Sequence, residues 1–206
     1  MLDPDSLTLV AITDGAERGT DEIVQRALAC VRGGATMVQL RLKDADARTQ
    51  VEVARALVAA LPEGIPLIVN DRADLAIASG AAGVHVGAED LPVAAVRRIL
   101  GPDRIVGLSV GNDAEALEAS GADYVGIGPV YATASKDDAG SAIGVEALER
   151  LAVLCARPAV GVGGIDVSNA AAVIAGGARG VAVIRALFSA SDPEASARSL
   201  RSAIGR

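Results

Sequence analysis

The sequence predicts an α/β fold closed into a (β/α)8 barrel, the TIM-barrel class, from three observations. Short apolar runs alternate with segments of helical periodicity about eight times along the chain of 206 residues. Such regular alternation is typical of parallel strands joined by right-handed crossovers. Apolar residues make up 51% of the chain, aromatic residues only 1%, and there are 23 glycines. This composition suits buried parallel strands of small aliphatic residues beneath closely packed helices.

Eight apolar runs are the expected strands. They are LTLVAIT, TMVQLR, IPLIVN, GVHVG, RIVGLS, DYVGIG, PAVGVG and GVAVI, beginning near Leu7, Thr36, Ile65, Gly83, Arg104, Asp123, Pro158 and Gly180. The clearest helical segments between them cover residues 21–34, 47–61, 92–101 and 145–155. Eight units in about 200 residues fit the compact end of this fold's size range. The competing open sheet usually has a Gly-rich turn after its first strand, which ITDGAERG matches poorly. We therefore expect one barrel domain over residues 1–206.

Composition and charge exclude several classes of function. A net charge of −7 argues against nucleic-acid binding, which needs a basic face. No apolar stretch reaches the roughly 18 residues that span a membrane, and the first residues do not resemble a signal peptide, so we expect a cytoplasmic protein. Cys30 and Cys155 lie far apart in apolar helical patterns and are expected to be buried free thiols. A phosphorylated ligand would need cations or a metal gathered locally.

Polar side chains follow the second expected strand. Gln39, Arg41 and Lys43 are spaced by two, so their side chains share one face of an extended chain. The active site of this fold lies at the carboxyl ends of the strands. If the shared face points inward, an amide and two cations converge on the mouth of the barrel. If it points outward, the three residues form only a polar strand end in solvent.

Two carboxylates follow the third and fourth strands. Strand three ends in Asn70 and Asp71, and the loop after strand four carries Glu89 and Asp90. Mg²⁺ prefers oxygen ligands and typically binds one or two carboxylates together with substrate phosphates, a scheme that Asp71 and Asp90 fit. Each carboxylate, taken alone, is better explained as the cap of the helix that follows. His85, the only histidine, lies within strand four and is expected to pack in the barrel interior.

Hydroxyls, a lysine and glycines follow the later strands. Strand five ends at Ser109, which either donates to a phosphate or caps the next helix. After strand six, a long loop carries Thr133, Ser135 and Lys136, residue types that suit anion binding in an active-site lid. Strands seven and eight end in GVGGI and VIRAL, where this fold commonly binds phosphate through backbone N–H groups. The sequence thus predicts two anion-binding regions, one with cations and a metal and one built from backbone.

Six segments in this order resemble the thiamine-phosphate synthase family. They are TMVQLRLK, LIVNDRADLA, GVHVGAEDLP, GPVYATASKDDAG, GVGGI and GVAVIRAL, and the resemblance covers nearly the whole chain. It implies a transferase of thiamine biosynthesis in which the nitrogen of a thiazole phosphate, or of its carboxylated form, displaces pyrophosphate from a pyrimidine methylene with the help of Mg²⁺. A dissociative displacement needs no protein nucleophile, because the enzyme mainly neutralises the leaving group.

The resemblance also implies roles for individual residues. Contacts to the pyrimidine pyrophosphate fall to Gln39, Leu40, Arg41, Leu42, Lys43, Asn70, Ser109 and Lys136. Contacts to the thiazole phosphate fall to Thr133, Ala134, Ser135, Gly164, Ile184 and Arg185. Asp71 and Asp90 would hold Mg²⁺, and the catalytic cations would be Arg41, Lys43 and Lys136. The partners are then small phosphorylated substrates, with a homo-oligomer left open.

Three departures from the family pattern bear on this assignment. Ser135 stands where the family often has Thr and keeps the hydroxyl, whereas Arg185 stands where a Ser is common. Gly111 occupies the place of a His that many relatives carry after strand five. A related thiazole tautomerase is one alternative function, but it is expected to carry that His. A non-catalytic thiamine-phosphate-binding barrel is another, although it would not need carboxylates and lysines suited to leaving-group activation.

Overall fold

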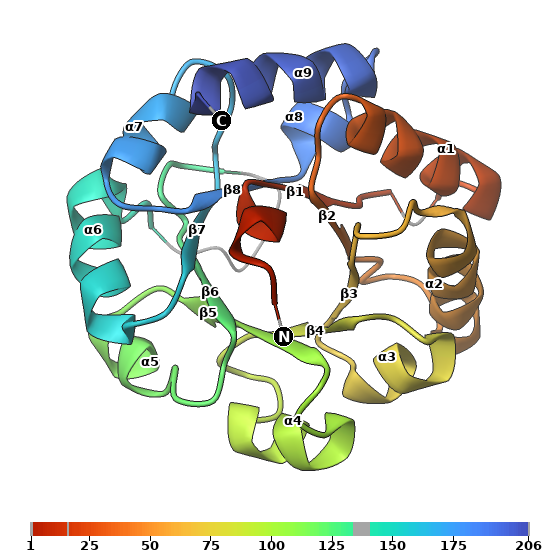
Figure 1. Ribbon diagram of the computed structural model, residues 1–206, viewed down its shortest axis with the longest axis horizontal. Coiled ribbons are helices and arrows are strands. Elements are labelled where there is room, and N and C mark those ends of the chain that lie inside the picture. Colours follow the sequence, from red (N-terminus) through yellow and green to blue (C-terminus); the bar gives the residue numbers. More distant parts are fainter. Residues whose placement is uncertain (1, 16, 134–140, 206) are drawn as a thin grey trace.

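The computed structural model of the protein describes residues 2–15, 17–133 and 141–205. Within these residues eight parallel strands pair in chain order, and β8 pairs with β1 to close the barrel (Figure 1). They are β1 (Leu9–Ile12), β2 (Met37–Leu40), β3 (Leu67–Asn70), β4 (Gly83–Val86), β5 (Ile105–Val110), β6 (Tyr124–Ile127), β7 (Ala159–Val162) and β8 (Gly180–Val183). The predicted (β/α)8 barrel is confirmed.

Helices form a ring outside the strands in the described part of the chain (Figure 1). They are α1 (Thr20–Arg32), α2 (Ala47–Ala60), α3 (Ala73–Ser79), α4 (Val93–Leu100), α5 (Asp113–Leu117), α6 (Gly144–Cys155), α7 (Ala170–Ala175), α8 (Arg185–Phe188) and α9 (Pro193–Ile204). None of the helices in the described residues is long and apolar enough to cross a membrane.

A short 3-10 helix, η1 (Pro4–Leu7), covers the centre of the ring at the amino ends of the strands (Figure 1). The first strand was expected to begin near Leu7, and β1 begins two residues later, at Leu9. The side chain of Asp3 accepts a hydrogen bond from the N–H of Asp5, and Pro4 stands at the first helical position, so the chain turns there before β1 begins. The buried side chain of Leu7 then packs into the bottom of the barrel.

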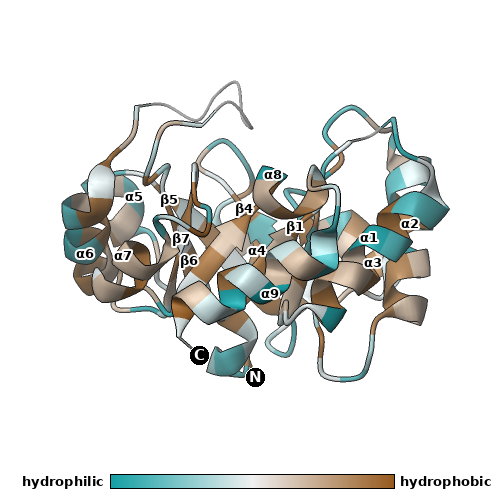
Figure 2. Ribbon diagram, turned by 90° about the horizontal axis from the view of Figure 1, so that it is seen from above, coloured by the Kyte–Doolittle hydropathy of each residue, from teal (hydrophilic) through white to brown (hydrophobic). Residues whose placement is uncertain are grey.

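Two apolar layers hold the barrel together (Figure 2). The larger lies between the strands and the helices, and the smaller lies inside the barrel. The inner layer consists of Leu7, Val10, Ile12, Met37, Ile68, Tyr124, Val160, Ala182 and Ile184. Polar residues replace apolar ones near the carboxyl ends of the same strands, as Gln39 and His85 show. The barrel interior is therefore apolar toward η1 and polar toward the opposite face.

Both cysteines are buried and free, as expected. Burial raises the pKa of the Cys30 thiol to about 12 and also raises the pKa of Cys155. Both thiols therefore stay protonated and unreactive at neutral pH.

Candidate active site

A cavity of about 990 Å³ opens at the carboxyl ends of the strands, on the face opposite η1. The structure brings many of the residues singled out from the sequence together in its lining. These are Gln39, Arg41, Lys43, Asn70, Asp71, Asp90, Ser109, Thr133, Gly164, Ile184 and Arg185. The face shared by Gln39, Arg41 and Lys43 thus points into the mouth of the barrel, and not only into solvent.

Other residues of the predicted set lie elsewhere. The side chains of Leu40 and Leu42 are buried in the apolar layer between strands and helices, because alternate residues of a strand point to opposite faces. Only their backbone can meet a ligand in the cavity. Ala134, Ser135 and Lys136 lie outside the described residues.

The end of β1 fixes the backbone of Arg41. The fully buried hydroxyl of Thr13 accepts a hydrogen bond from the Arg41 N–H at 2.8 Å and donates to the Arg41 carbonyl at 3.1 Å. The side chain of Arg41 is only 9% exposed, and its Nη1 lies 4.0 Å from Oδ1 of Asp14. Within the described residues its Nε has no hydrogen-bond partner. A buried guanidinium with unused donors at a cavity is suited to bind an anion.

Thr13 and Asp14 were not among the residues predicted from the sequence. The available signal was their position directly after the first strand, where side chains of this fold face the mouth of the barrel. A single threonine–aspartate pair is too common to be recognised as part of a site without the barrel around it.

Two amides meet at the ends of β2 and β3. Nε2 of Gln39 donates to Oδ1 of Asn70 at 2.7 Å. This bond uses the Asn70 oxygen as an acceptor, so the Asn70 amide nitrogen is the group of that side chain that can donate to a ligand.

Asp71 does not cap the helix that follows it, so the capping expectation for this residue was wrong. The N-terminal cap of α3 is Arg72, whose side chain makes no capping hydrogen bond. Asp71 instead has a left-handed backbone with φ of 64°, and its N–H donates to the carbonyl of His85 at 2.8 Å. Such a conformation costs a non-glycine residue about 1 kcal/mol or more, and strained residues cluster at functional sites.

Asp90 does not cap the following helix either, because the N-terminal cap of α4 is Pro92. Its Oδ2 accepts a hydrogen bond from the N–H of Gly87 at 2.7 Å, within the loop that follows β4. The two carboxylates therefore reach one cavity from the ends of neighbouring strands, β3 and β4. Among the described residues there is no group of three His, Cys, Asp or Glu side chains that could hold a metal by themselves.

The end of β5 supplies Ser109, which is not a helix cap. Asn112 caps α5 by accepting from the N–H of Glu115 at 3.1 Å, and Oε2 of Glu115 accepts from the N–H of Gly111 at 2.6 Å. This reciprocal pair satisfies the start of α5 without Ser109. The Ser109 hydroxyl lies instead 3.0 Å from Nε2 of His85. The interior position expected for His85 is confirmed, and its polar contacts go beyond packing.

A glycine turn after β7 lines the opposite side of the cavity. Gly163 and Gly164 have φ of 93° and 62°. A Cβ at Gly164 would lie 2.6 Å from the carbonyl oxygen of Ala132, so this turn packs directly on the chain that follows β6. Nδ2 of Asn169 donates to the Gly164 carbonyl at 2.9 Å and fixes the turn. The side chain of Arg185, at the start of α8, is exposed.

The described lining of the cavity carries more acidic than basic side chains. Of the described lining residues, the cationic ones are Arg41, Lys43 and Arg185, and the acidic ones are Asp71, Glu89, Asp90, Glu115 and Asp166. A polyphosphate entering this set would meet more acids than bases, so its binding favours an additional cation.

The closed barrel and its mouth, rich in amides, cations and carboxylates, define the class of this protein as a barrel enzyme acting on small phosphorylated substrates. A family model described as thiamine monophosphate synthase matches residues 9–187, and the chain belongs to that family. It is thus a transferase of thiamine biosynthesis with thiamine-phosphate synthase function, which confirms the resemblance seen in the sequence.

Individual relatives agree with this assignment. A thiamine-phosphate synthase from Xanthobacter autotrophicus is 50% identical over 204 residues, covering 98% of this chain and 97% of the relative. One from Azorhizobium caulinodans is also 50% identical, and the match covers 98% of this chain and 96% of the relative. Among solved structures, a thiamine phosphate pyrophosphorylase from Pyrococcus furiosus is 35% identical, with a TM-score of 0.88, and covers 98% of this chain and 97% of that one. A 3-hexulose-6-phosphate synthase, 21% identical with a TM-score of 0.75, shares the fold alone.

Proposed function

We propose that the cavity holds a pyrimidine pyrophosphate on the β2–β5 side and a thiazole phosphate on the β6–β8 side, and joins them to thiamine phosphate with release of pyrophosphate. The observation that supports this division is the asymmetry of the lining. The amide side chains and most of the charged ones lie at the ends of β2 to β5, whereas the opposite side has the glycine turn at Gly163–Gly164 after β7. The chain would work as one domain in the cytoplasm.

On the first side, Arg41, Lys43 and Lys136 are the proposed catalytic cations. The two hydrogen bonds of Thr13 hold the backbone of Arg41 in place before substrate arrives, and its side chain, only 9% exposed, lies with Nη1 4.0 Å from Oδ1 of Asp14. Donors fixed in advance stabilise charge that develops on a leaving oxygen without a cost of reorganisation at the moment of reaction. Gln39, Asn70 and Ser109 would orient the pyrimidine pyrophosphate, with the backbone of Leu40 and Leu42 between them.

Asp71 and Asp90 are the proposed ligands of Mg²⁺. Both offer oxygen donors to one cavity, and neither is used as a helix cap. Two carboxylates are a typical protein contribution to a magnesium site whose other ligands are water and substrate phosphate. When bound, Mg²⁺ would supply positive charge against the departing pyrophosphate. The hydrogen bond from Gly87 would orient the Asp90 carboxylate toward this task.

On the second side, Thr133, Ala134, Ser135, Gly164, Ile184 and Arg185 are the proposed contacts of the thiazole phosphate. The positive φ angles of Gly163 and Gly164, and the close approach of Gly164 to Tyr131 and Ala132, let the turn pack against the chain after β6 at the cavity wall. Asn169 holds that turn in place through the Gly164 carbonyl. Binding there would set the thiazole nitrogen against the pyrimidine methylene, which is a positioning role.

The direct test incubates the protein with both substrates and Mg²⁺ and measures thiamine phosphate and pyrophosphate. Formation of both products in equal amounts, and their loss on chelation with rescue by added Mg²⁺, is the expected result. Isomerisation of a thiazole phosphate without metal would favour the tautomerase alternative instead. Binding of thiamine phosphate with no product from saturating substrates would overturn the proposal in favour of a regulatory barrel.

A further inference from the structure

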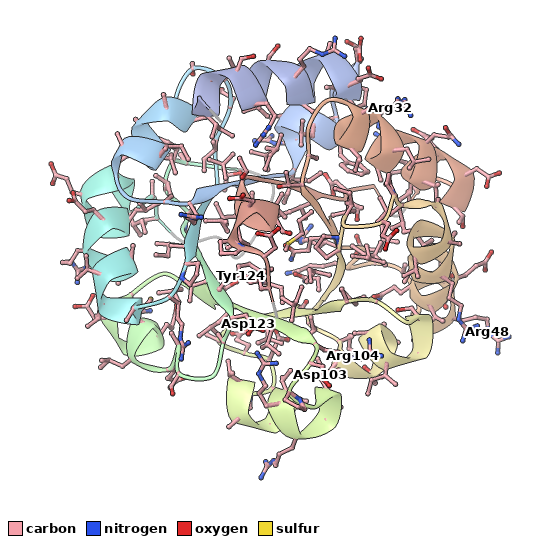
Figure 3. The ribbon with its side chains drawn as sticks, in the orientation of Figure 1. Arg32, Arg48, Asp103, Arg104, Asp123 and Tyr124 are labelled. Atoms are coloured by element: carbon pink, nitrogen blue, oxygen red, sulfur yellow. The ribbon has the colours of Figure 1, made fainter. Side chains whose placement is uncertain are left out.

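Three polar side chains form a line from the barrel interior to the cavity. The hydroxyl of Tyr124 on β6 lies 3.0 Å from Nδ1 of His85 on β4, and Nε2 of His85 lies 3.0 Å from the hydroxyl of Ser109 on β5. Tyr124 is only 1% exposed and belongs to the inner apolar layer, whereas Ser109 is half-buried at the cavity wall. Figure 3 labels Tyr124 inside the ring of helices, near the barrel axis.

Two glycines make room for this line. Gly107 on β5 is paired with His85 on one side and with Tyr124 on the other. A Cβ at Gly107 would lie 2.4 Å from His85 Nδ1 and 2.4 Å from Tyr124 Cζ, and one at Gly126 would lie 3.1 Å from His85 Cε1. Strand β5, which lies between His85 and Tyr124, therefore lacks a side chain at Gly107, where the two rings approach each other.

The direction of each hydrogen bond follows from the depth of Tyr124. Burial raises the pKa of the Tyr124 phenol, so it is neutral and carries one hydrogen. Among the described residues, the hydrogen-bond partner found for this hydroxyl is Nδ1 of His85. If Nδ1 carried the proton, the phenolic hydrogen would lack an acceptor in an apolar layer, at a cost of about 1–3 kcal/mol. The phenol therefore donates to Nδ1, which leaves the imidazole proton on Nε2.

The position of the His85 proton determines where the Ser109 hydroxyl hydrogen can point. With its proton on Nε2, His85 donates to the Ser109 oxygen, so the Ser109 hydrogen cannot point back toward the ring. We propose that Tyr124 is a positioning residue that acts through the Nε2-protonated form of His85 and directs the Ser109 O–H into the cavity, where it donates to an oxygen of the substrate pyrophosphate. The contact between Ser109 and pyrophosphate rests on the proposed function, whereas the order of protons along the line does not.

The proton order can be read directly, because His85 is the only histidine of the chain. Protein labelled with ¹⁵N-histidine gives one pair of imidazole resonances without any assignment problem. Before substrate is added, we expect Nε2 to be protonated and Nδ1 to be bare. A wild-type ring protonated on Nδ1 would overturn the proposal. In Tyr124→Phe, the Nδ1-protonated form should appear beside the first, and an unchanged ring would contradict the role of Tyr124.

A double-mutant cycle tests the link to catalysis. Tyr124→Phe should lower kcat/KM about 10-fold, and Ser109→Ala should lower it at least as much. The double variant should be no worse than Ser109→Ala alone, because Tyr124 has nothing left to position. Effects that multiply would show that Tyr124 acts independently of Ser109 and would overturn the proposal.

A matched control separates positioning from loss of a buried hydrogen bond. The hydroxyl of Ser79 in α3 is buried and donates to the Leu75 carbonyl at 2.8 Å, away from the cavity lining. Ser79→Ala should lower stability without changing kcat/KM. If Tyr124→Phe resembles Ser79→Ala in both respects, its role is structural only. If the ring is protonated as expected but Ser109→Ala is fully active, the proton order stands and the pyrophosphate contact of Ser109 fails.

Discussion

The two sides of the cavity are built by different means. At the ends of β2 to β5, the lining is rich in amide and charged side chains, and Thr13 fixes the backbone of one of these residues, Arg41. On the opposite side, the turn after β7 packs closely on the chain that follows β6, because Gly163 and Gly164 lack side chains. We therefore expect the first side to be sensitive to loss of a charge and the second to be sensitive to addition of volume. This difference matches a reacting pyrophosphate on one side and a bound, unreactive phosphate on the other.

Removal of a carboxylate from the β2–β5 side should have the largest effect. Asp90→Ala should lower kcat by about 100-fold or more, because the metal would lose a ligand while charge develops on the leaving group. Asp90→Asn is the informative partner, since its side-chain oxygen can still accept from the Gly87 N–H. Steady-state kinetics with a Mg²⁺ titration should show a similar loss for both. Full activity of Asp90→Asn would show that Asp90 only stabilises its loop and does not bind the metal.

Added volume on the opposite side should have the next largest effect. Gly164→Ala places a Cβ 2.6 Å from the Ala132 oxygen at a φ of 62°, so the turn must shift. We expect KM for the thiazole phosphate to rise about 10-fold, with little change in KM for the pyrimidine pyrophosphate. Gly64→Ala is the control, because Gly64 has φ of 87° but open space around its Cβ position and does not line the cavity. It should lose stability and keep both KM values.

The strained backbone of Asp71 should give a smaller effect, visible in stability. At φ of 64°, Asp71→Gly should be more stable than Asp71→Ala by about 1 kcal/mol, because only glycine adopts this conformation without strain. Both variants lack the carboxylate and should be nearly inactive. Urea unfolding of the pair measures the difference, and any contact made by the carboxylate cancels between them. Equal stabilities would show that the turn relaxes without cost.

The smallest effect is expected at Arg185. Its side chain is exposed, so any contact with a phosphate is screened by solvent and salt. Arg185→Ala should raise KM for the thiazole phosphate less than about 5-fold, and less still at high salt. Arg48→Ala is a control with an exposed arginine at the outer edge of α2 (Figure 3), and it should show no such change. If Arg185→Ala raises KM for the thiazole phosphate as much as Gly164→Ala does, Arg185 contacts the phosphate directly and is not screened by solvent.

Local pattern was sufficient for most of the fold. Strand starts were placed within two residues because an apolar run flanked by helical periodicity has few other interpretations in a parallel barrel. The first and third strands differ most, each by two residues. At the first strand, a run of apolar residues does not reveal that Asp3 and Pro4 start a helical turn before it. The same limit explains the capping expectations for Asp71, Asp90 and Ser109. A polar residue before a helix resembles a cap until the true first residue of that helix is known.

The sequence by itself determined the barrel, the family and the residue types at the strand ends, because periodicity and spacing are properties of a single chain. Only the tertiary structure decided which of those residues share a cavity and what holds each of them. The contact of Thr13 with Arg41 joins the ends of two neighbouring strands, and the contact of Tyr124 with His85 joins two strands on either side of β5; both pairs are distant in sequence. Gly107 shows the reason most clearly. Its missing side chain has meaning only because the sheet register places it between His85 and Tyr124.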